Sequence, residues 1–223
     1  MNDLVAHRTV LSVVVGSRAY GLATSESDVD RRGVYVAPTE SFWRFEKPPS
    51  SVEGPEPERL SWEVEHFCGL ALKANPTVLE VLVSPLIEVC TDVGAELRTL
   101  APAFLSRRAA VTFERATARQ LGRATSESRG ERRRKQLMHS IRMLIMAESL
   151  LRDGKLEVDM AGHREALLAV RSGGTDWPDA MAWVDRLRVE IDTVASTSPL
   201  PEEPDTAAVE YWLASVRRRD LQS

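Results

Sequence analysis

The sequence has few cysteines and no long apolar segment, and each absence narrows the class of protein. Among 223 residues only Cys68 and Cys90 are cysteines. Their spacing fits neither a disulfide framework nor a metal site, so we expect free thiols in a reducing cytoplasm. No apolar run approaches the roughly 18 residues that a membrane-spanning helix needs. The first residues, Met1–Leu4, lack the basic start and apolar block of a signal peptide. These absences predict a cytoplasmic protein with no membrane partner.

Neither sign of charge dominates the whole chain, but charge is unevenly distributed along it. The formal net charge is −4. Residues 106–142 carry eleven Lys and Arg against three Glu, a local excess of +8, whereas residues 173–210 carry nine acidic residues against two arginines, a local excess of −7. The basic segment is suited to phosphates or nucleic acid. The alternative is a set of solvated helix faces, some of them paired with the acidic segment.

The chain divides into two differently patterned halves. Residues 1–100 alternate strand-like and helix-like segments, and the apolar run Val10–Val15 and the segment Val29–Val36 are strand candidates. From Thr91 onward helical periodicity dominates, and residues 130–151 form the strongest helix candidate. We therefore expect an α+β fold, with a small mixed β-sheet in a domain of residues 1–100 and a helical domain of residues 101–223.

The turn that follows the first strand candidate is the most informative part of the sequence. Gly16 lets the backbone approach a phosphate closely, and a helix beginning at Ser17 would point free N–H groups at an anion. Taken alone, such a pair is more typical of an ordinary strand-to-helix turn with Ser17 as helix N-cap. Asp28 and Asp30 follow at the start of the second strand candidate, where residues i and i+2 point to the same side. Two carboxylates beside such a turn suit Mg²⁺, which shares oxygen ligands with substrate phosphates.

These motifs resemble a known family. Gly16-Ser17 followed by Ser27-Asp28-Val29-Asp30 is similar to the signature of the DNA polymerase β nucleotidyltransferase superfamily. The longer strings at 16–23 and 27–38, together with the blocks at 74–82 and 135–142, resemble the RNA repair pathway, or RNA-ligase-associated, polymerase β-like proteins. The resemblance covers roughly residues 10–172.

The resemblance implies a fold and a metal site. It implies a small mixed sheet that carries the site at one edge, followed by a helical domain. It also implies a two-metal mechanism, with Mg²⁺ or Mn²⁺ bound by Asp28, Asp30 and a third carboxylate from a neighbouring strand. The family pattern places that third carboxylate at Glu58, where the family usually has Asp, and Glu63 is the reserve candidate.

Further candidates for substrate binding come from the turn and from a basic helix. Gly16 and Ser17 are expected to hold the β and γ phosphates of a nucleoside triphosphate such as ATP, and Arg18 is directed either to these phosphates or outward. Lys135, His139 and Arg142 are spaced i, i+4, i+7 on the predicted helix, opposite its apolar face. Facing the metal site, they would bind the triphosphate or the acceptor. The alternative is a plain amphipathic helix with a solvated polar face.

The sequence therefore predicts a metal-dependent nucleotidyltransferase that transfers a nucleoside monophosphate to a hydroxyl and releases pyrophosphate. The resemblance and the basic segment favour an RNA or tRNA 3′ end as acceptor. One alternative is a protein hydroxyl, as in antitoxin-like nucleotidyltransferases that AMPylate a partner. Another is a non-catalytic module that binds nucleotide or RNA without turnover.

Overall fold

A five-stranded mixed sheet covered by helices forms the framework of the molecule, which confirms the expected α+β class. The computed structural model describes residues 2–25, 27–54, 56–126 and 130–222. The strands are β1 (Thr9–Val14), β2 (Arg31–Tyr35), β3 (Ser51–Glu53), β4 (Arg59–Glu63) and β5 (Leu86–Cys90). Their spatial order is β3-β4-β2-β1-β5. Every strand of the described residues thus lies in the first 100 residues.

The centre of the sheet is β1, which pairs antiparallel with β2 on one side and with β5 on the other. Its sequence, Thr-Val-Leu-Ser-Val-Val, is rich in β-branched residues, which fit a pleated, buried surface. Strand β4 pairs parallel with β2, with Arg31 opposite Arg59, and antiparallel with β3. The parallel pairing matters for function because it brings the starts of β2 and β4 to the same edge of the sheet.

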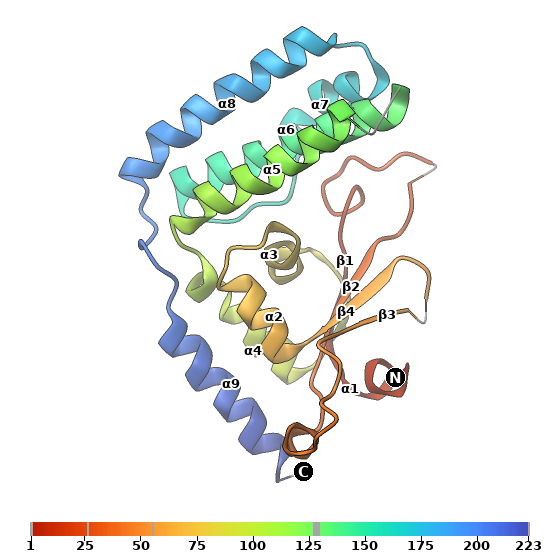
Figure 1. The fold of residues 1–223 in the computed structure, drawn as a ribbon, viewed down its shortest axis with the longest axis vertical. Helices are drawn as coiled ribbons and strands as arrows, with labels where there is room; N and C mark the ends of the chain where they lie inside the picture. The colour runs from red at the N-terminus through yellow and green to blue at the C-terminus, as the bar shows by residue number, and fades with distance from the viewer. Residues whose placement is uncertain (1, 26, 55, 127–129, 223) are drawn as a thin grey trace.

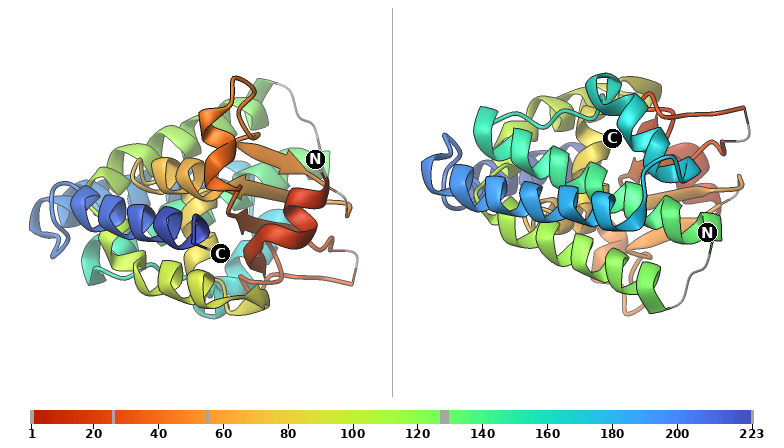
Figure 2. Two further views of the ribbon diagram at one scale, coloured as in Figure 1. Left: turned by 90° about the horizontal axis from the view of Figure 1, so that it is seen from below. Right: turned by 90° about the horizontal axis from the view of Figure 1, so that it is seen from above.

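Helices cover both faces of the sheet and continue beyond it. They are α1 (Asn2–Arg8), α2 (Val64–Ala71), α3 (Pro76–Val83), α4 (Asp92–Thr99), α5 (Arg108–Ser126), α6 (Gly130–Asp153), α7 (Arg164–Ser172), α8 (Trp177–Thr197) and α9 (Thr206–Asp220). Helices α2, α3 and α4 lie on one face and α1 on the other (Figure 1). Helices α5 to α8 form a layer beyond one end of the sheet, as the two further views also show (Figure 2). Among the described residues, every helix falls short of what a membrane crossing requires in length or apolar character.

The last helix returns to the sheet-bearing half, so the two ends of the chain lie close together (Figure 1). The Arg8 guanidinium at the end of α1 lies 2.6 Å from the Asp220 carboxylate at the end of α9. One cluster of buried apolar side chains includes residues of both halves, among them Val13, Phe67, Phe113, Leu144 and Trp212. The division into domains of residues 1–100 and 101–223 stays a prediction, but these two parts share a core.

Several boundaries differ from those predicted. The second strand begins at Arg31 rather than Val29, so Asp28 and Asp30 lie directly before it. The short β3 and the N-terminal α1 are not apparent from periodicity, since three residues or two helical turns carry too little pattern. The long α6, predicted for residues 130–151, extends over Gly130–Asp153.

Candidate functional site

The turn after β1 forms the first wall of the candidate site. Gly16 adopts a φ of +72°, a conformation that L side chains rarely adopt. The N–H of Tyr20 donates to the Gly16 carbonyl at 3.1 Å, and the N–H of Leu22 donates to the Ser17 carbonyl at 2.8 Å. Residues 16–21 therefore form a wide turn rather than the helix that the sequence suggested at Ser17. The expectation of a helix N-terminus there was wrong, because Gly16 and Gly21 both adopt a positive φ, which a right-handed helix does not contain.

Gly16 lies directly against the carboxylate of Asp30. A Cβ atom built on Gly16 would be 2.5 Å from Asp30 Oδ2, closer than any stable contact. The N–H of Val15 donates to the Asp30 carbonyl at 2.9 Å, which extends the β1–β2 ladder up to the turn. The Gly-Ser turn and one predicted metal ligand are thus in contact, although 14 residues separate Gly16 and Asp30 in the sequence.

Asp28 lies on the loop between this turn and β2, and Arg18 of the turn contacts that loop. The Asp28 side chain is exposed, and its residue lies two positions before Asp30. The Arg18 guanidinium donates to the carbonyls of Ser27, at 3.0 Å, and Asp28, at 3.3 Å. Arg18 therefore holds the loop that carries the Asp pair, and in this conformation its Nε and one terminal nitrogen serve that purpose. A role of Arg18 at phosphates stays a prediction.

Glu58 lies opposite Asp30, directly before the neighbouring strand β4. The parallel register of β2 and β4 pairs Arg31 with Arg59, so the residues that precede them are adjacent at the sheet edge. The Glu58 carbonyl accepts from the Arg31 N–H at 3.0 Å and from Arg32 Nη1 at 3.0 Å. Glu58 also has a positive φ of +56°, rare for a residue with a side chain and strained for its backbone. The backbone of the predicted third ligand is therefore firmly placed at this edge.

Asp28 and Asp30 supply part of the ligand set that a metal ion would need. No group of three His, Cys, Asp or Glu side chains within the described ranges is arranged to hold a metal ion. Mg²⁺ is commonly bound by one or two carboxylates together with substrate phosphates, however, and the pair of the exposed Asp28 and the partly exposed Asp30 beside a phosphate-sized turn matches that donor set. A guanidinium nitrogen of Arg32 lies 3.8 Å from Asp30 Oδ1 and partly balances its charge.

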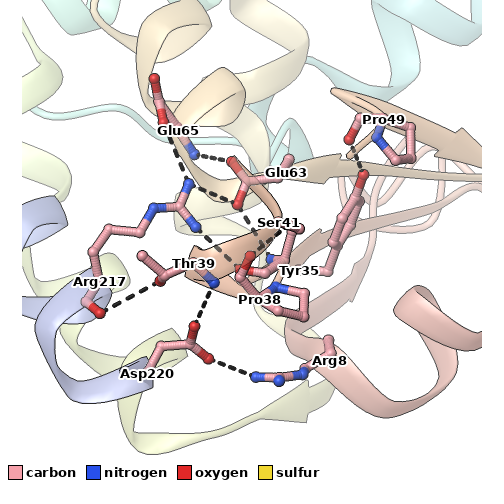
Figure 3. A network of polar contacts seen from close by, with 11 residues as sticks. Arg8, Tyr35, Pro38, Thr39, Ser41, Pro49, Glu63, Glu65, Arg217 and Asp220 are labelled. Atoms are coloured by element: carbon pink, nitrogen blue, oxygen red, sulfur yellow. Dashed lines mark hydrogen bonds and ion pairs between the residues drawn. The ribbon is translucent and has the colours of Figure 1, made fainter. Parts of the chain in front are cut away.

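The reserve candidate Glu63 lies at the other end of β4 in a different environment. Its side chain is almost completely buried, accepts the N–H of Glu65 at 2.7 Å as N-cap of α2, and pairs with Arg217 of α9 at 2.9 Å. Figure 3 shows Arg217 contacting the carboxylates of Glu63 and Glu65, with Asp220 bound to Thr39 and Arg8 nearby. Burial raises the pKa of Glu63, and the charge of Arg217 opposes that shift. Glu63 is thus already engaged in joining α9 to the sheet.

The three polar residues predicted on one face of α6 have different surroundings. Lys135 is exposed, whereas His139 is mostly buried and Arg142 is almost completely buried. Burial, together with the positive charges of Arg142, Lys135 and Arg171, lowers the pKa of His139 to about 3, so its imidazole is neutral at physiological pH. The expectation that all three side chains form an open polar face was wrong for Arg142, because neighbouring segments enclose α6 where this residue lies.

Arg142 forms a buried cluster with Tyr20 and Glu80. Its Nη1 lies 3.1 Å from Glu80 Oε1, and its guanidinium carbon lies 3.8 Å from the centre of the Tyr20 ring. The Tyr20 hydroxyl donates to the second Glu80 oxygen. Burial raises the pKa of Tyr20 well above its usual value, so the phenol keeps this proton. Tyr20 belongs to the Gly16 turn, and the cluster therefore ties that turn to α3 and α6. Contact of Arg142 with a nucleotide stays a prediction.

Sequence reasoning missed Tyr20 and Glu80. A signal was present for Glu80, which is the only charged residue in the apolar run of α3, Val-Leu-Glu-Val-Leu. A carboxylate in such a helix is buried at a high free-energy cost unless a cation pairs with it. The partner on α6 is 62 residues away, so only the tertiary structure identifies it.

The fold and this edge of the sheet define a polymerase β-like protein, with a Gly-Ser turn packed against an Asp-x-Asp pair. The model of the RNA repair pathway DNA polymerase beta family (RlaP) matches residues 2–215, and the chain belongs to that family. It is also 34% identical over 83 residues to the uncharacterized protein YcgL of Bacillus subtilis (strain 168). That match covers 36% of this chain and 32% of YcgL, so it spans about a third of the relative. No solved structure matches the chain.

Proposed function

We propose that the protein is a metal-dependent nucleotidyltransferase that acts in RNA repair. The observation that carries this proposal is the contact of the Gly16 turn with the Asp30 carboxylate at the starts of β2 and β4. A phosphate-sized turn beside two carboxylates is suited to a nucleoside triphosphate with its divalent cations. Membership of a polymerase beta family supports the same reaction class.

In the proposed reaction each residue of the site has a distinct task. Gly16 and Ser17 bind the β and γ phosphates through backbone N–H groups and the serine hydroxyl. Asp28 and Asp30 would hold Mg²⁺ or Mn²⁺, and Glu58, which directly precedes the neighbouring strand β4, would turn its side chain toward them as third carboxylate when the metal is bound. Bound metal lowers the pKa of the attacking hydroxyl and stabilises charge on the leaving group. The acceptor oxygen forms a bond to the α-phosphorus, the bond to the β-phosphate oxygen breaks, and pyrophosphate leaves.

An RNA 3′ hydroxyl is the acceptor that we favour. The description of the family names an RNA repair pathway, and the basic residues of the chain concentrate on α5 and the start of α6; both support an RNA acceptor. A protein hydroxyl would require a recognition surface for a particular partner, and none of the observations singles one out.

A label-transfer assay tests the proposal. The full chain would be incubated with Mg²⁺ or Mn²⁺, each α-labelled nucleoside triphosphate in turn, and separate RNA and protein acceptors. We expect label on RNA, reduced by a factor of at least about 10²–10³ in Asp28→Ala and Asp30→Ala. Both variants should keep the wild-type melting temperature, because these side chains lie at the surface.

A matched pair of variants tests the third carboxylate. Glu58→Gln should lose most of the transfer activity and keep stability, whereas Glu63→Gln should lose stability through its buried contacts with α9. Label on protein instead of RNA would indicate an AMPylating enzyme. Full activity in both aspartate variants would refute the site, and nucleotide binding without any transfer would indicate a non-catalytic module.

A further inference from the structure

A cavity lies between the loop of the candidate site and the helical layer. Its volume is about 690 Å³, within the range of small-molecule and cofactor pockets. It is lined by Thr24, Ser25, Glu131, Arg134, Glu165, Leu168, Ala169, Arg171 and Ser172, and we call it the α6–α7 cavity. Ser25 precedes the predicted metal ligand Asp28 by three residues. The cavity is therefore lined in part by the segment that leads from the Gly16 turn to Asp28.

The loop wall of this cavity is held in place by α7. Arg164 donates from Nε to the Gly21 carbonyl at 2.7 Å and from Nη2 to the Ala23 carbonyl at 3.5 Å. These bonds connect α7 to the segment that runs from the Gly16 turn toward Thr24. A ligand in the cavity would thus contact a wall continuous with the nucleotide-binding turn.

The helix side of the cavity carries cations that no carboxylate neutralises. Arg134 and Arg171, together with Lys135, which follows Arg134 on α6 but does not line the cavity, have no carboxylate oxygen within 4.0 Å in the part of the chain that the structure describes. Arg152, at the other end of α6, pairs with Glu148 at 2.5 Å. The Nε of Arg134 donates to the Arg171 carbonyl at 3.3 Å, which orients the rest of its guanidinium.

Positive charges also surround His139, which lies on α6 one turn after Lys135. The charges that act on its imidazole are those of Arg142, Lys135 and Arg171, all positive, and they lower its pKa together with burial. Part of the Arg142 charge is offset by Glu80. Around His139, α6 and α7 therefore present the positive charges of Lys135 and Arg171, which would attract an anion.

The cavity is not uniformly basic, and this distinguishes its ligand from a simple anion. Glu131 and Glu165 line it together with the hydroxyls of Thr24 and Ser25. Carboxylates repel phosphate but accept hydrogen bonds from ribose hydroxyls and base amino groups. RNA offers both chemistries at once, because the 2′-hydroxyl is a donor that DNA lacks.

We propose that the α6–α7 cavity binds the single-stranded 3′ end of an RNA acceptor, with phosphodiesters at Arg134 and Arg171 and ribose hydroxyls at Glu131 and Glu165. This inference rests on the proposed function, because only a transferase would use the bound RNA as an acceptor. RNA binding itself can be measured without catalysis. Under this proposal α7 contacts the RNA directly, whereas the Gly-Ser turn and the Asp pair contact only the triphosphate and its metal ions.

Fluorescence anisotropy tests the binding of a labelled single-stranded RNA to the full chain in the presence of EDTA. Arg134→Gln and Arg171→Gln should each weaken binding about 5- to 10-fold and lower the slope of log K against log salt by about 0.7 per lost phosphate contact. Arg186→Gln, which removes the same charge from an exposed position on α8, should leave both quantities unchanged. Arg171→Lys should restore part of the affinity if the fold is intact.

A second variant tests the chemistry of the ligand. The wild type should bind RNA more tightly than DNA of the same sequence, and Glu165→Gln should reduce that ratio. Equal affinity of wild type, Arg134→Gln and Arg171→Gln for RNA, at equal melting temperatures, would overturn the proposal. An increase in KM for the nucleoside triphosphate with unchanged RNA affinity would overturn it as well, because the cavity would then hold the donor nucleotide.

The failure of this inference is distinguishable from failure of the proposed function. The double variant Asp28→Ala/Asp30→Ala should bind RNA as the wild type does. Cavity-dependent RNA binding without any label transfer would refute the transferase and keep the cavity. Transfer to RNA that is indifferent to Arg134 and Arg171 would keep the transferase and refute the cavity.

Discussion

Single residues at the candidate site are constrained by close approach. Gly16 has no side chain, and the Asp30 carboxylate occupies the space that a Cβ would fill. Gly21, in the same turn, has nearly the same φ of +71°, but the nearest atom to its Cβ position would be an Asp159 oxygen at 3.7 Å. The two glycines therefore share the positive φ, but only Gly16 is in contact with the predicted metal ligand Asp30.

This difference predicts different outcomes for two alanine variants. Gly16→Ala and Gly21→Ala should each lose about 1–2 kcal/mol of unfolding free energy, because alanine disfavours a positive φ. Only Gly16→Ala should displace Asp30 and reduce label transfer by a factor of about 10² or more. Thermal melts and transfer rates would be compared side by side. Equal loss of activity in both variants would show that the turn conformation matters rather than the contact.

His139 makes stability depend on pH. The pKa of its imidazole is about 3 in the folded state, whereas that of an unperturbed histidine is 6.5. Below pH 6.5 the imidazole of the unfolded chain binds a proton, whereas that of the folded chain stays neutral. The contribution of the neutral His139 to the free energy of unfolding is therefore complete above pH 6.5 and is lost as pH falls toward 3. We expect the loss to approach about 1.4 kcal/mol per pH unit within that window. In His139→Gln, denaturant titrations at pH 7 and pH 5 should differ less than in the wild type; an equal difference would contradict this assignment.

At the level of elements, two arginines in different surroundings join α9 to the rest of the molecule, Arg217 to strand β4 and Arg219 to helix α4. Arg217 is mostly buried, pairs with the buried Glu63 at 2.9 Å and donates to the Ala37 carbonyl at 3.2 Å. Arg219 forms two bonds to Glu96, at 2.7 and 2.6 Å, but its side chain is 46% exposed. Solvent screens the second pair, whereas removal of one partner from the first leaves a buried charge unpaired.

The two arginines therefore predict unequal effects within one helix. Arg217→Ala should lower the free energy of unfolding by about 3–5 kcal/mol. Arg219→Ala should cost about 1 kcal/mol or less. Urea titrations of both variants measure the difference, and equal losses would show that burial does not decide the strength of these ion pairs.

At the level of the whole molecule, one core joins the sheet-bearing half to the helical half. Buried apolar residues of both halves belong to the same cluster, and α9 returns from the end of the chain to the start of the sheet. Tyr20, Glu80 and Arg142 add a polar connection between the halves. Relative rotation of the two parts would expose this buried cluster.

We accordingly expect a single cooperative unfolding transition for the full chain. A fragment of residues 1–100 should lack a cooperative transition, because the faces that contact α6 and α9 would be exposed. Circular dichroism melts of both chains provide the test. A cooperative melt of the fragment would support two independently folding domains.

The sequence by itself determined the elements and the chemistry that depends on local order. An apolar run identified the central strand, the 3.6-residue period identified α6, and the Gly-Ser and Asp-x-Asp spacing identified the candidate site. These signals are local, since backbone geometry dictates side-chain direction over a few residues. Only the tertiary structure decided that Asp30 contacts Gly16, that Glu58 adjoins it across a parallel register, and that Arg142 is enclosed with Glu80 and Tyr20 rather than facing solvent. Such contacts join residues up to 122 positions apart, from Tyr20 to Arg142, and they depend on which faces are buried together when the chain packs.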